Sequence, residues 1–168
     1  MNLFTGQASD AFFGGDVSTV ARTLLHEAAD APPLQRGTLL WTAQTLAPQS
    51  LAILYALYKH HAGRREFALA ERAAEKGLAE AARQAGLPAD WRTVPPRPPG
   101  IDFQADGPAR FWLFTLKALA FIRLRSGRPA QARELLDQLA RVGGDARVGD
   151  DVTAALLASA EAAGISPD

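Results

Sequence analysis

The chain has 168 residues, of which 48% are apolar and 21% charged, so one folded domain with a substantial core is expected. Its 18 basic and 18 acidic side chains balance, which removes a general electrostatic reason to expect nucleic acid or an anionic membrane as a partner. Without cysteine it can form no disulfide, no thiolate metal site and no cysteine nucleophile. The amino terminus does not resemble a secretory signal, and no stretch offers the roughly 20 apolar residues of a membrane-spanning helix. We therefore expect a cytoplasmic protein that makes no use of a membrane.

Residues that favour helices recur in blocks separated by glycine or proline, whereas alternating β-branched runs are missing. This pattern predicts an all-α protein of about eight helices, joined by short connections that make neighbours antiparallel, in a single domain spanning 1–168. In chain order, the predicted helices are 3–13, 17–30, 34–46, 49–62, 65–86, 108–126, 129–142 and 149–163. Gly14 and Gly15 would end the first helix, and Asp16 or Ser18 would cap the second.

One segment interrupts the helices, because Pro88 to Pro108 holds six of the eleven prolines. Proline lacks the amide donor of a helix interior, so we expect a proline-rich loop over 88–107. Two interpretations of this loop stay open. It can be an extended crossover between two helical halves, with Trp91 packed on the body, or a lid or docking strand for a partner.

The end of the chain carries a spaced set of small and apolar residues. Counting from a glycine at position 0, positions 2, 5, 9 and 12 hold a proline, an alanine and two leucines: Gly127, Pro129, Ala132, Leu136 and Leu139. This spacing resembles the tetratricopeptide repeat, in which a glycine opens the turn between helix A and helix B, and a small residue lets the two helices pack closely. The resemblance implies a stack of antiparallel helix pairs, with 149–163 as a capping helix.

Two looser copies of the pattern precede this one. Phe67, Ala70, Ala74 and Leu78 follow the helix B pattern after Gly63, which stands about two residues early for the turn. Gly15, Val17, Val20 and Leu24 keep the spacing in a third. Within the last copy, Arg123 departs from the aromatic residue usual near the end of helix A. The glycines are 48 and 64 residues apart, against a family period of about 34, so the resemblance requires insertions.

A second resemblance covers FWLFTLKALAFIRLRSGRPAQARELLDQLA and the following VGDDVTAALLASA. These segments look like small repeat proteins encoded among nitrogen-fixation genes of proteobacteria. This resemblance implies an accessory role around nitrogenase maturation or electron supply.

A stripe of basic and aromatic residues marks the sixth predicted helix. At 100° per residue its five members fall within about 80° of one another: Arg110, Phe114, Lys117, Phe121 and Arg125. By the tetratricopeptide resemblance, the last four line the concave groove of the stack, and Tyr55 and Lys59 add to it from the fourth helix. Such a groove would bind an acidic, partly apolar segment of another protein. The competing interpretation is that the phenylalanines are core residues and the basic heads reach out from its edge.

Other candidate sites are weaker. His60 and His61 diverge by about 100° on a helix and have no histidine or carboxylate three or four residues away, so we expect no metal site. The carboxylates Glu66, Glu71, Glu75 and Glu80 alternate with basic residues and are expected on a solvated face. No phosphate loop, dinucleotide fingerprint or nucleophile elbow occurs, so we expect neither catalysis nor a cofactor.

The sequence thus favours an adaptor or assembly factor that binds another protein or peptide. The alternatives are self-association into a homo-oligomer, a small-ligand module, or an enzyme whose groups are gathered only by folding.

Overall fold

The computed structural model describes residues 17–105 and 107–143, and in this part of the chain all regular structure is helical. The elements are α2 (Thr19–Asp30), α3 (Pro33–Leu46), α4 (Leu51–Gly63), α5 (Phe67–Ala85), a single 3-10 turn η1 (Trp91–Thr93), α6 (Pro108–Arg125) and α7 (Pro129–Gly143). The all-α prediction is confirmed here, and each helix agrees with its predicted range to within two residues. The helices predicted at 3–13 and 149–163, with the Gly15 turn, lie outside the described residues.

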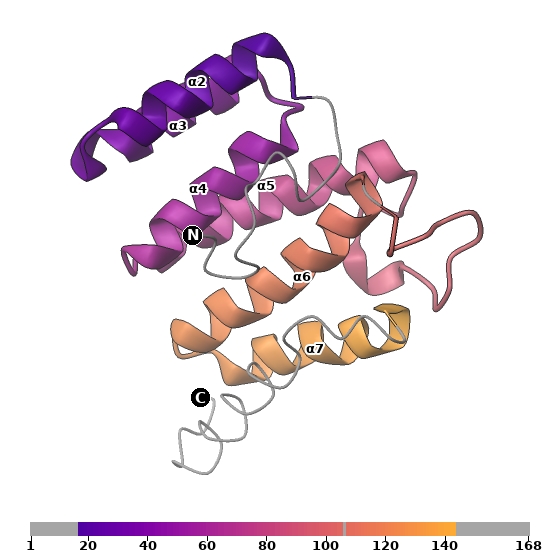
Figure 1. Cartoon of the computed structure of the whole chain (residues 1–168). Coiled ribbons are helices and arrows are strands. Elements are labelled where there is room, and N and C mark those ends of the chain that lie inside the picture. Colours follow the sequence, from indigo (N-terminus) through magenta and orange to yellow (C-terminus); the bar gives the residue numbers. More distant parts are fainter. Residues whose placement is uncertain (1–16, 106, 144–168) are drawn as a thin grey trace.

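The helices form three consecutive antiparallel pairs, as Figure 1 shows. Helices α2 and α3 lie at one end of the molecule, α6 and α7 at the other, and α4 and α5 between them. Within each pair the two helices pack on one another, and the second helix of a pair packs on the first helix of the next. The first helices also contact each other, α2 with α4 and α4 with α6. The described part is therefore a short stack in which each pair rests mainly on its neighbours.

Side chains and prolines at the helix ends explain several boundaries. Ser18 caps α2, because its Oγ accepts from the amide of Ala21 at 3.2 Å, and Ser50 caps α4 in the same way. Helices α3, α6 and α7 begin at proline, whose missing amide hydrogen is not needed in a first turn. Helix α5 ends at Gly86, which takes the left-handed conformation with φ of 73°.

The α4–α5 and α6–α7 turns have the same backbone structure. In both, three successive amides donate to the carbonyl oxygens four, three and five residues before them, at 2.9 to 3.2 Å. The second of the three residues has positive φ, 62° at Arg65 and 78° at Gly127. Gly127 therefore makes the turn that its position predicts. In the earlier turn Gly63 ends the helix, and Arg65, two residues later, takes the left-handed conformation in its place.

The core lies among α4, α5, α6 and α7. Large side chains with under 2% exposure come from α4, α6, α7 and the segment before α6: Trp112, Tyr55, Tyr58, Phe111, Ile53, Leu54, Leu57, Leu116, Leu119, Ile122, Leu135 and Val94. Helix α5 contributes mainly alanines and Gly77, where an added Cβ would lie 3.3 Å from the ring of Phe111. Small residues on α5 thus let α6 approach closely. Helices α2 and α3 bury only Ala21, Ala28, Gly37, Leu40 and Ala43.

The proline-rich segment before α6 packs against the helices over the residues described. Trp91 is 8% exposed, and the buried Gln138 of α7 donates to its carbonyl oxygen at 2.8 Å and to that of Val94 at 2.9 Å. Further along, the ring of Phe103 stacks on Trp112 of α6 with centroids 5.8 Å apart. Because buried amide and aromatic contacts fix both ends of this stretch, it is a structured part of the body.

Candidate functional site

The residues expected to bind a partner lie on α4 and α6, which pack side by side. Tyr55 is fully buried and Phe114 is 7% exposed, and their ring centroids are 6.0 Å apart. These two aromatic residues are therefore part of the core between the helices. Lys59, Arg110, Lys117 and Phe121 are half-buried and Arg125 is exposed. We call the surface formed by Lys59, Arg110, Lys117, Phe121 and Arg125 the basic face; Tyr55 and Phe114 lie beneath it.

Two of the basic residues lie over aromatic rings. The Nζ of Lys59 is 5.9 Å from the ring centroid of Tyr55, and the guanidinium carbon of Arg125 is 5.9 Å from that of Phe121. Burial lowers the pKa of Lys59. Cation–π contacts at this distance stabilise a cation beside an apolar surface. The basic face thus combines positive charge with the ring of Phe121, whereas Phe114 is a core residue, as the competing interpretation of the stripe expected.

The shared turn geometry shows that the site residues of the two helices occupy equivalent positions. Tyr55 lies ten residues before Arg65, and Lys117 lies ten residues before Gly127. Lys59 and Phe121 each lie six residues before the same turn positions. At both positions, therefore, one helix carries an aromatic residue and the other a lysine. The sequence could not establish this register, because Gly63 does not occupy the turn position that Gly127 does.

Charge is distributed unevenly between the helices. Neither α4 nor α6 contains an aspartate or glutamate, although acidic and basic residues balance over the whole chain. Their charged residues are basic, while α5 and α7 carry Glu71, Glu75, Glu80, Glu134 and Asp137. The first helices of the second and third pairs are therefore positive, and the second helices carry the acids.

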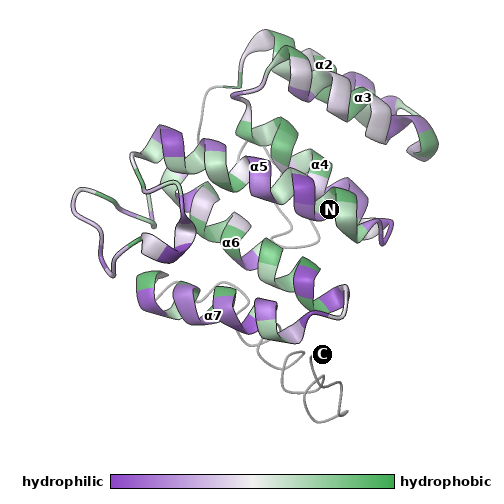
Figure 2. Ribbon diagram, turned by 180° about the vertical axis from the view of Figure 1, so that it is seen from behind, coloured by the Kyte–Doolittle hydropathy of each residue, from purple (hydrophilic) through white to green (hydrophobic). Residues whose placement is uncertain are grey.

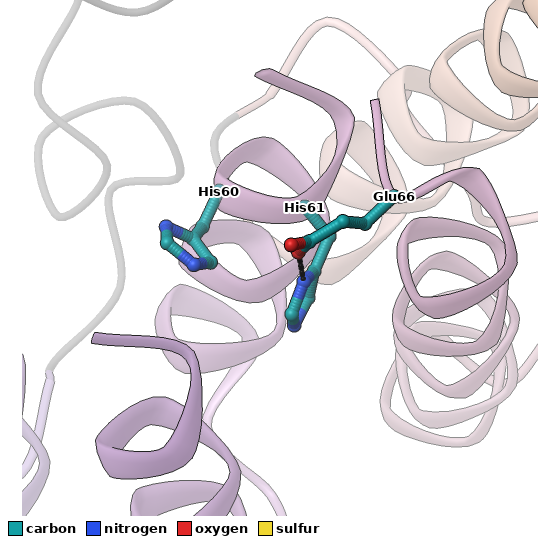
Figure 3. Close-up of side chains that lie close together, drawn as sticks. All are labelled: His60, His61 and Glu66. Atoms are coloured by element: carbon teal, nitrogen blue, oxygen red, sulfur yellow. Dashed lines mark hydrogen bonds and ion pairs between the residues drawn. The ribbon is translucent and has the colours of Figure 1, made fainter. Parts of the chain in front are cut away.

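His60, His61 and Glu66 come together at the α4–α5 turn (Figure 3). The Nε2 of the buried His61 accepts from the indole Nε1 of Trp41 on α3 at 3.0 Å. Its Nδ1 must then carry the proton, which it donates to Glu66 at 2.6 Å. A metal ion at Nδ1 would require the other tautomer, whose Nε2 proton would face the proton of Trp41. The arrangement of these three groups favours a structural role over metal binding.

The pKa values of the two surface groups of this cluster follow from their surroundings. Burial, followed by the neighbouring His61, lowers the pKa of His60. The hydrogen bonds from His61 and Arg64 hold the pKa of Glu66 below its usual range. The sequence did not reveal the His61 and Glu66 contact, because Glu66 follows the end of α4 and a helical spacing of three or four residues does not reach it.

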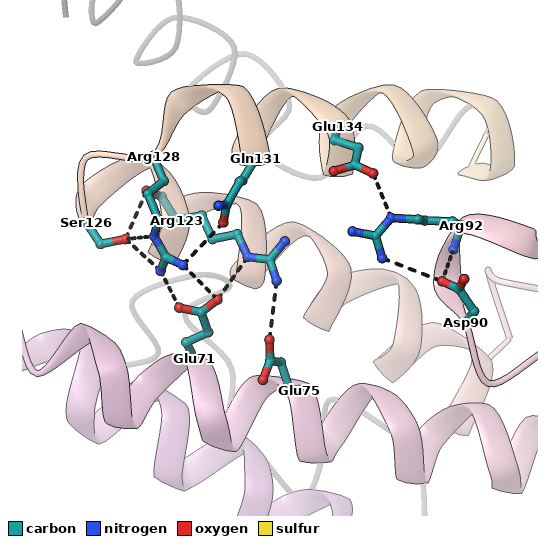
Figure 4. A network of polar contacts seen from close by, with 9 residues as sticks. All are labelled: Glu71, Glu75, Asp90, Arg92, Arg123, Ser126, Arg128, Gln131 and Glu134. Atoms are coloured by element: carbon teal, nitrogen blue, oxygen red, sulfur yellow. Dashed lines mark hydrogen bonds and ion pairs between the residues drawn. The ribbon is translucent and has the colours of Figure 1, made fainter. Parts of the chain in front are cut away.

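A second polar cluster joins α5, α6 and the α6–α7 turn (Figure 4). Glu71 of α5 accepts from the Nε of Arg123 at 3.0 Å and from both terminal nitrogens of Arg128. The side chains of Arg123 and Glu71 are only 11% and 15% exposed, so the prediction that Glu71 lies on a solvated face is wrong. Burial alone would raise the pKa of Glu71, but the hydrogen bonds from Arg128 and Arg123 outweigh it and lower the pKa. Arg123 occupies the place of the aromatic residue expected there.

Comparisons with protein-family models, curated proteins and solved structures gave no match. Among the described residues, none of the helices is both long and apolar enough to cross a bilayer.

Proposed function

We propose that this protein is a tetratricopeptide-like adaptor that binds an acidic, partly apolar segment of another protein on its basic face. The proposal involves no covalent chemistry and no cofactor. Its support comes from the repeated turn, the order in which the helices pack, and the charge carried by α4 and α6.

The repeat part of the proposal is supported by backbone geometry. The α4–α5 and α6–α7 turns share one hydrogen-bond pattern, and the second helix of each pair packs on the first helix of the next. In a stack of this kind, the first helices of successive pairs follow one another along a single face, and such faces are the extended binding surfaces of repeat proteins. The spacing of 64 residues between Gly63 and Gly127 is longer than the family period of about 34. The long α5 and the proline-rich segment after it account for the additional residues.

The binding part rests on one observation above the others, which is that two equivalent helix positions carry an aromatic residue and a lysine in both pairs. The pairs are Tyr55 with Lys117 and Lys59 with Phe121. An acidic segment lying across α4 and α6 would meet a lysine on each helix and the half-buried ring of Phe121, while Tyr55 supports Lys59 from beneath. Neither helix contributes a carboxylate of its own, so the charge that α4 and α6 present to an acidic segment is positive. Phe121, half-buried at the surface, is the anchor we expect for an apolar side chain of the partner.

The test is affinity capture from the lysate of the native organism with the wild-type chain and a Lys117→Glu, Arg125→Glu variant, with the retained proteins identified by mass spectrometry. We expect the wild type to retain a partner with an acidic segment and the variant to lose it. Retention should also weaken as salt is raised, because exposed charges are screened. Equal retention by a folded charge-reversal variant would contradict the proposal.

A matched control separates the basic face from net charge. Lys76→Glu with Arg83→Glu makes the same change of charge on the exposed side of α5. The ion pair of Arg83 with Glu80 lies at the surface and contributes little to stability. We expect this control to keep the partner. Circular dichroism of both variants shows whether the helical fold survives.

The pathway is a further part of the proposal. The resemblance to small repeat proteins of nitrogen-fixation gene clusters suggests that the partner acts in nitrogenase maturation or electron supply. The same capture experiment tests this directly, since a partner from an unrelated process would remove that assignment and leave the adaptor role intact.

A further inference from the structure

We propose that the outer surface of α3 is a self-association surface, on which the α3 helices of two copies pack antiparallel. The surface is separate from the basic face, and the proposal does not depend on the adaptor role. Seven exposed residues form it, and we call them the α3 outer face: Leu34, Gln35, Thr38, Leu39, Thr42, Thr45 and Leu46.

The α3 outer face is uncharged and carries three exposed leucines. At 100° per residue its seven members occupy an arc of about 140°. Leu34 is 83% exposed and Leu46 63%, and α3 carries three of the five large hydrophobic residues with substantial exposure in the described part. Much of α3 is accordingly drawn white to green in Figure 2. Exposed apolar surface of this kind is typical of a surface that another molecule covers.

Two of the three threonines on this surface use their hydroxyl protons within the helix. The Oγ1 of Thr42 donates to the carbonyl oxygen of Thr38 at 2.9 Å, and that of Thr45 donates to the carbonyl oxygen of Trp41 at 3.1 Å. Both hydroxyl donors are therefore used within the helix. Covering these side chains leaves no hydroxyl proton without an acceptor, so the main cost of burying them is removed.

The lack of charged side chains on the α3 outer face favours a second copy of the chain as the molecule that covers it. The α3 outer face carries no charged side chain, although 21% of the chain is charged. The one charged residue of α3, Arg36, is turned away and donates to carbonyl oxygens at the end of α2, including that of Ala28 at 3.0 Å. A charged partner would lose solvation on this surface without gaining an ion pair. A second copy presents the same uncharged surface, so neither copy loses the hydration of a charge.

A two-fold antiparallel arrangement matches the residue pattern. When the two-fold axis crosses α3 at the height of residue 40, Thr38 of one copy lies level with Thr42 of the other. Leu34 of one copy then lies level with Leu46 of the other. The β-branched Thr38 and Thr42 lie near the middle of the arc, where the helices come closest, and the leucines lie toward its edges. In an antiparallel pair the two helix dipoles also point in opposite directions, which is the favourable arrangement. A 14-residue helix is about 21 Å long, so one helix pair buries less than the roughly 1,200 Å² of a standard interface. The dimer should therefore be weak and concentration-dependent.

The experiment is sedimentation analysis of the full chain over a wide range of concentrations. We expect the mass of the wild type to rise from monomer to dimer. Thr38→Glu with Thr42→Glu, and Thr38→Lys with Thr42→Lys, should each remain monomeric, because like charges then meet across the axis. An equimolar mixture of the two variants should dimerise again, because the charges are then opposite.

The matched control uses another exposed pair of threonines with the same spacing. Thr19 and Thr23 lie on α2, and Thr23 donates to the carbonyl oxygen of Thr19 as Thr42 does to that of Thr38. Thr19→Glu with Thr23→Glu should dimerise like the wild type. A wild type that stays monomeric at every concentration, a dimer that survives the charged α3 variants, or a mixture that stays monomeric would each overturn the proposal. Circular dichroism identifies any variant that has lost its helices.

Discussion

The α4–α5 and α6–α7 turns have the same backbone hydrogen bonds, yet different side chains tie them to the preceding pair. Next to the first turn, His61 accepts from Trp41 of α3 and donates to Glu66. Next to the second, Arg123 binds Glu71 of α5. His61 and Arg123 occupy equivalent positions, each four residues before the residue of positive φ. The backbone therefore repeats, while the contact that joins one pair to the next is set locally by the side chains available.

The α2 and α3 pair and the α4 to α7 body also differ in how many large side chains they bury. None of the large side chains with under 2% exposure in the described residues comes from α2 or α3, whereas α4 and α6 supply ten of the twelve. The contact at Arg123 is charge-assisted, and the contact between Trp41 and His61 joins neutral groups. We therefore expect the α2 and α3 pair to open at a lower free energy than the α4 to α7 body. Four predictions test the two contacts and the difference between the regions that they hold.

The largest effect is expected from Glu71→Gln. Removing one partner of a fully buried ion pair costs about 3–5 kcal/mol, and because Arg128 keeps 36% side-chain exposure we expect a loss of about 2–3 kcal/mol. Urea unfolding of both chains measures it. As a control, Glu75→Gln removes one bond at 3.3 Å from a side chain that is 53% exposed, and should change stability by less than about 0.5 kcal/mol. Equal losses in the two variants would show that the depth of Glu71 is unimportant.

The same variant has a defined pH dependence. The folded state lowers the pKa of Glu71 below its usual 4.5, so the carboxylate stabilises the fold above that pH. This stabilisation is lost as the pH falls through the lowered value, because the folded wild type then takes up a proton. The difference in unfolding free energy between the wild type and Glu71→Gln should be largest near neutrality and shrink below about pH 4.5. A constant difference would contradict the ionic origin of the contact.

The sequence predicted the helices but only part of the packing between them. Periodicity and the prolines located the six described helices, and the position of Gly127 identified a turn of positive φ. The equivalent turn uses Arg65, which no propensity rule favours there, so the register of the second pair could not be read from the sequence. The hydrogen bond between His61 and Glu66 was missed for a related reason. Glu66 lies beyond the end of α4 and approaches His61 only because of the turn.

For the candidate site, the direction of the side chains could be predicted from the sequence, but how deeply each is buried could not. The spacing of Phe114, Lys117 and Phe121 placed them on one stripe, and the structure has Phe114 buried while the other two are half-buried. Depth depends on how closely α4 packs on α6, which is a tertiary property. Whether a partner uses this surface stays a prediction, and so does the choice between an adaptor and a self-associating protein.

The second largest effect is expected from replacing a glycine by alanine at the α5–α6 interface, compared with the same replacement at the α3–α4 interface. An added Cβ at Gly77 would lie 3.3 Å from two atoms of the fully buried Phe111 ring, which itself packs near Tyr58. At Gly37 it would lie 3.2 Å from His60, which is half-buried and can shift toward solvent, and 3.2 Å from His61, which is buried and can yield only by lengthening its hydrogen bond to Trp41. Overpacking costs about 1–3 kcal/mol, offset by about 1 kcal/mol of helix propensity. We expect Gly77→Ala to destabilise by about 1–2 kcal/mol and Gly37→Ala by less than about 1 kcal/mol.

Urea unfolding of both alanine variants measures the two losses. A Gly37→Ala loss that equals or exceeds that of Gly77→Ala would show that the α3–α4 interface is as rigid as the α5–α6 interface, which contradicts the difference between the two regions.

The smallest effect, about 1 kcal/mol, is expected from Trp41→Phe, which keeps an aromatic ring but removes the indole donor to His61. Because water can partly replace the donor beside a half-buried residue, the loss should be modest. The informative result is which helices lose protection from amide hydrogen exchange. Amide hydrogen exchange should quicken across α2 and α3, which this contact ties to α4, and stay unchanged in α6. A double-mutant cycle with His61→Phe isolates the contact, since its coupling energy excludes losses that belong to either ring alone. Uniformly faster exchange in all helices would mean that the α2 and α3 pair opens only when the whole molecule unfolds, and that a single cooperative unit replaces the two regions argued here.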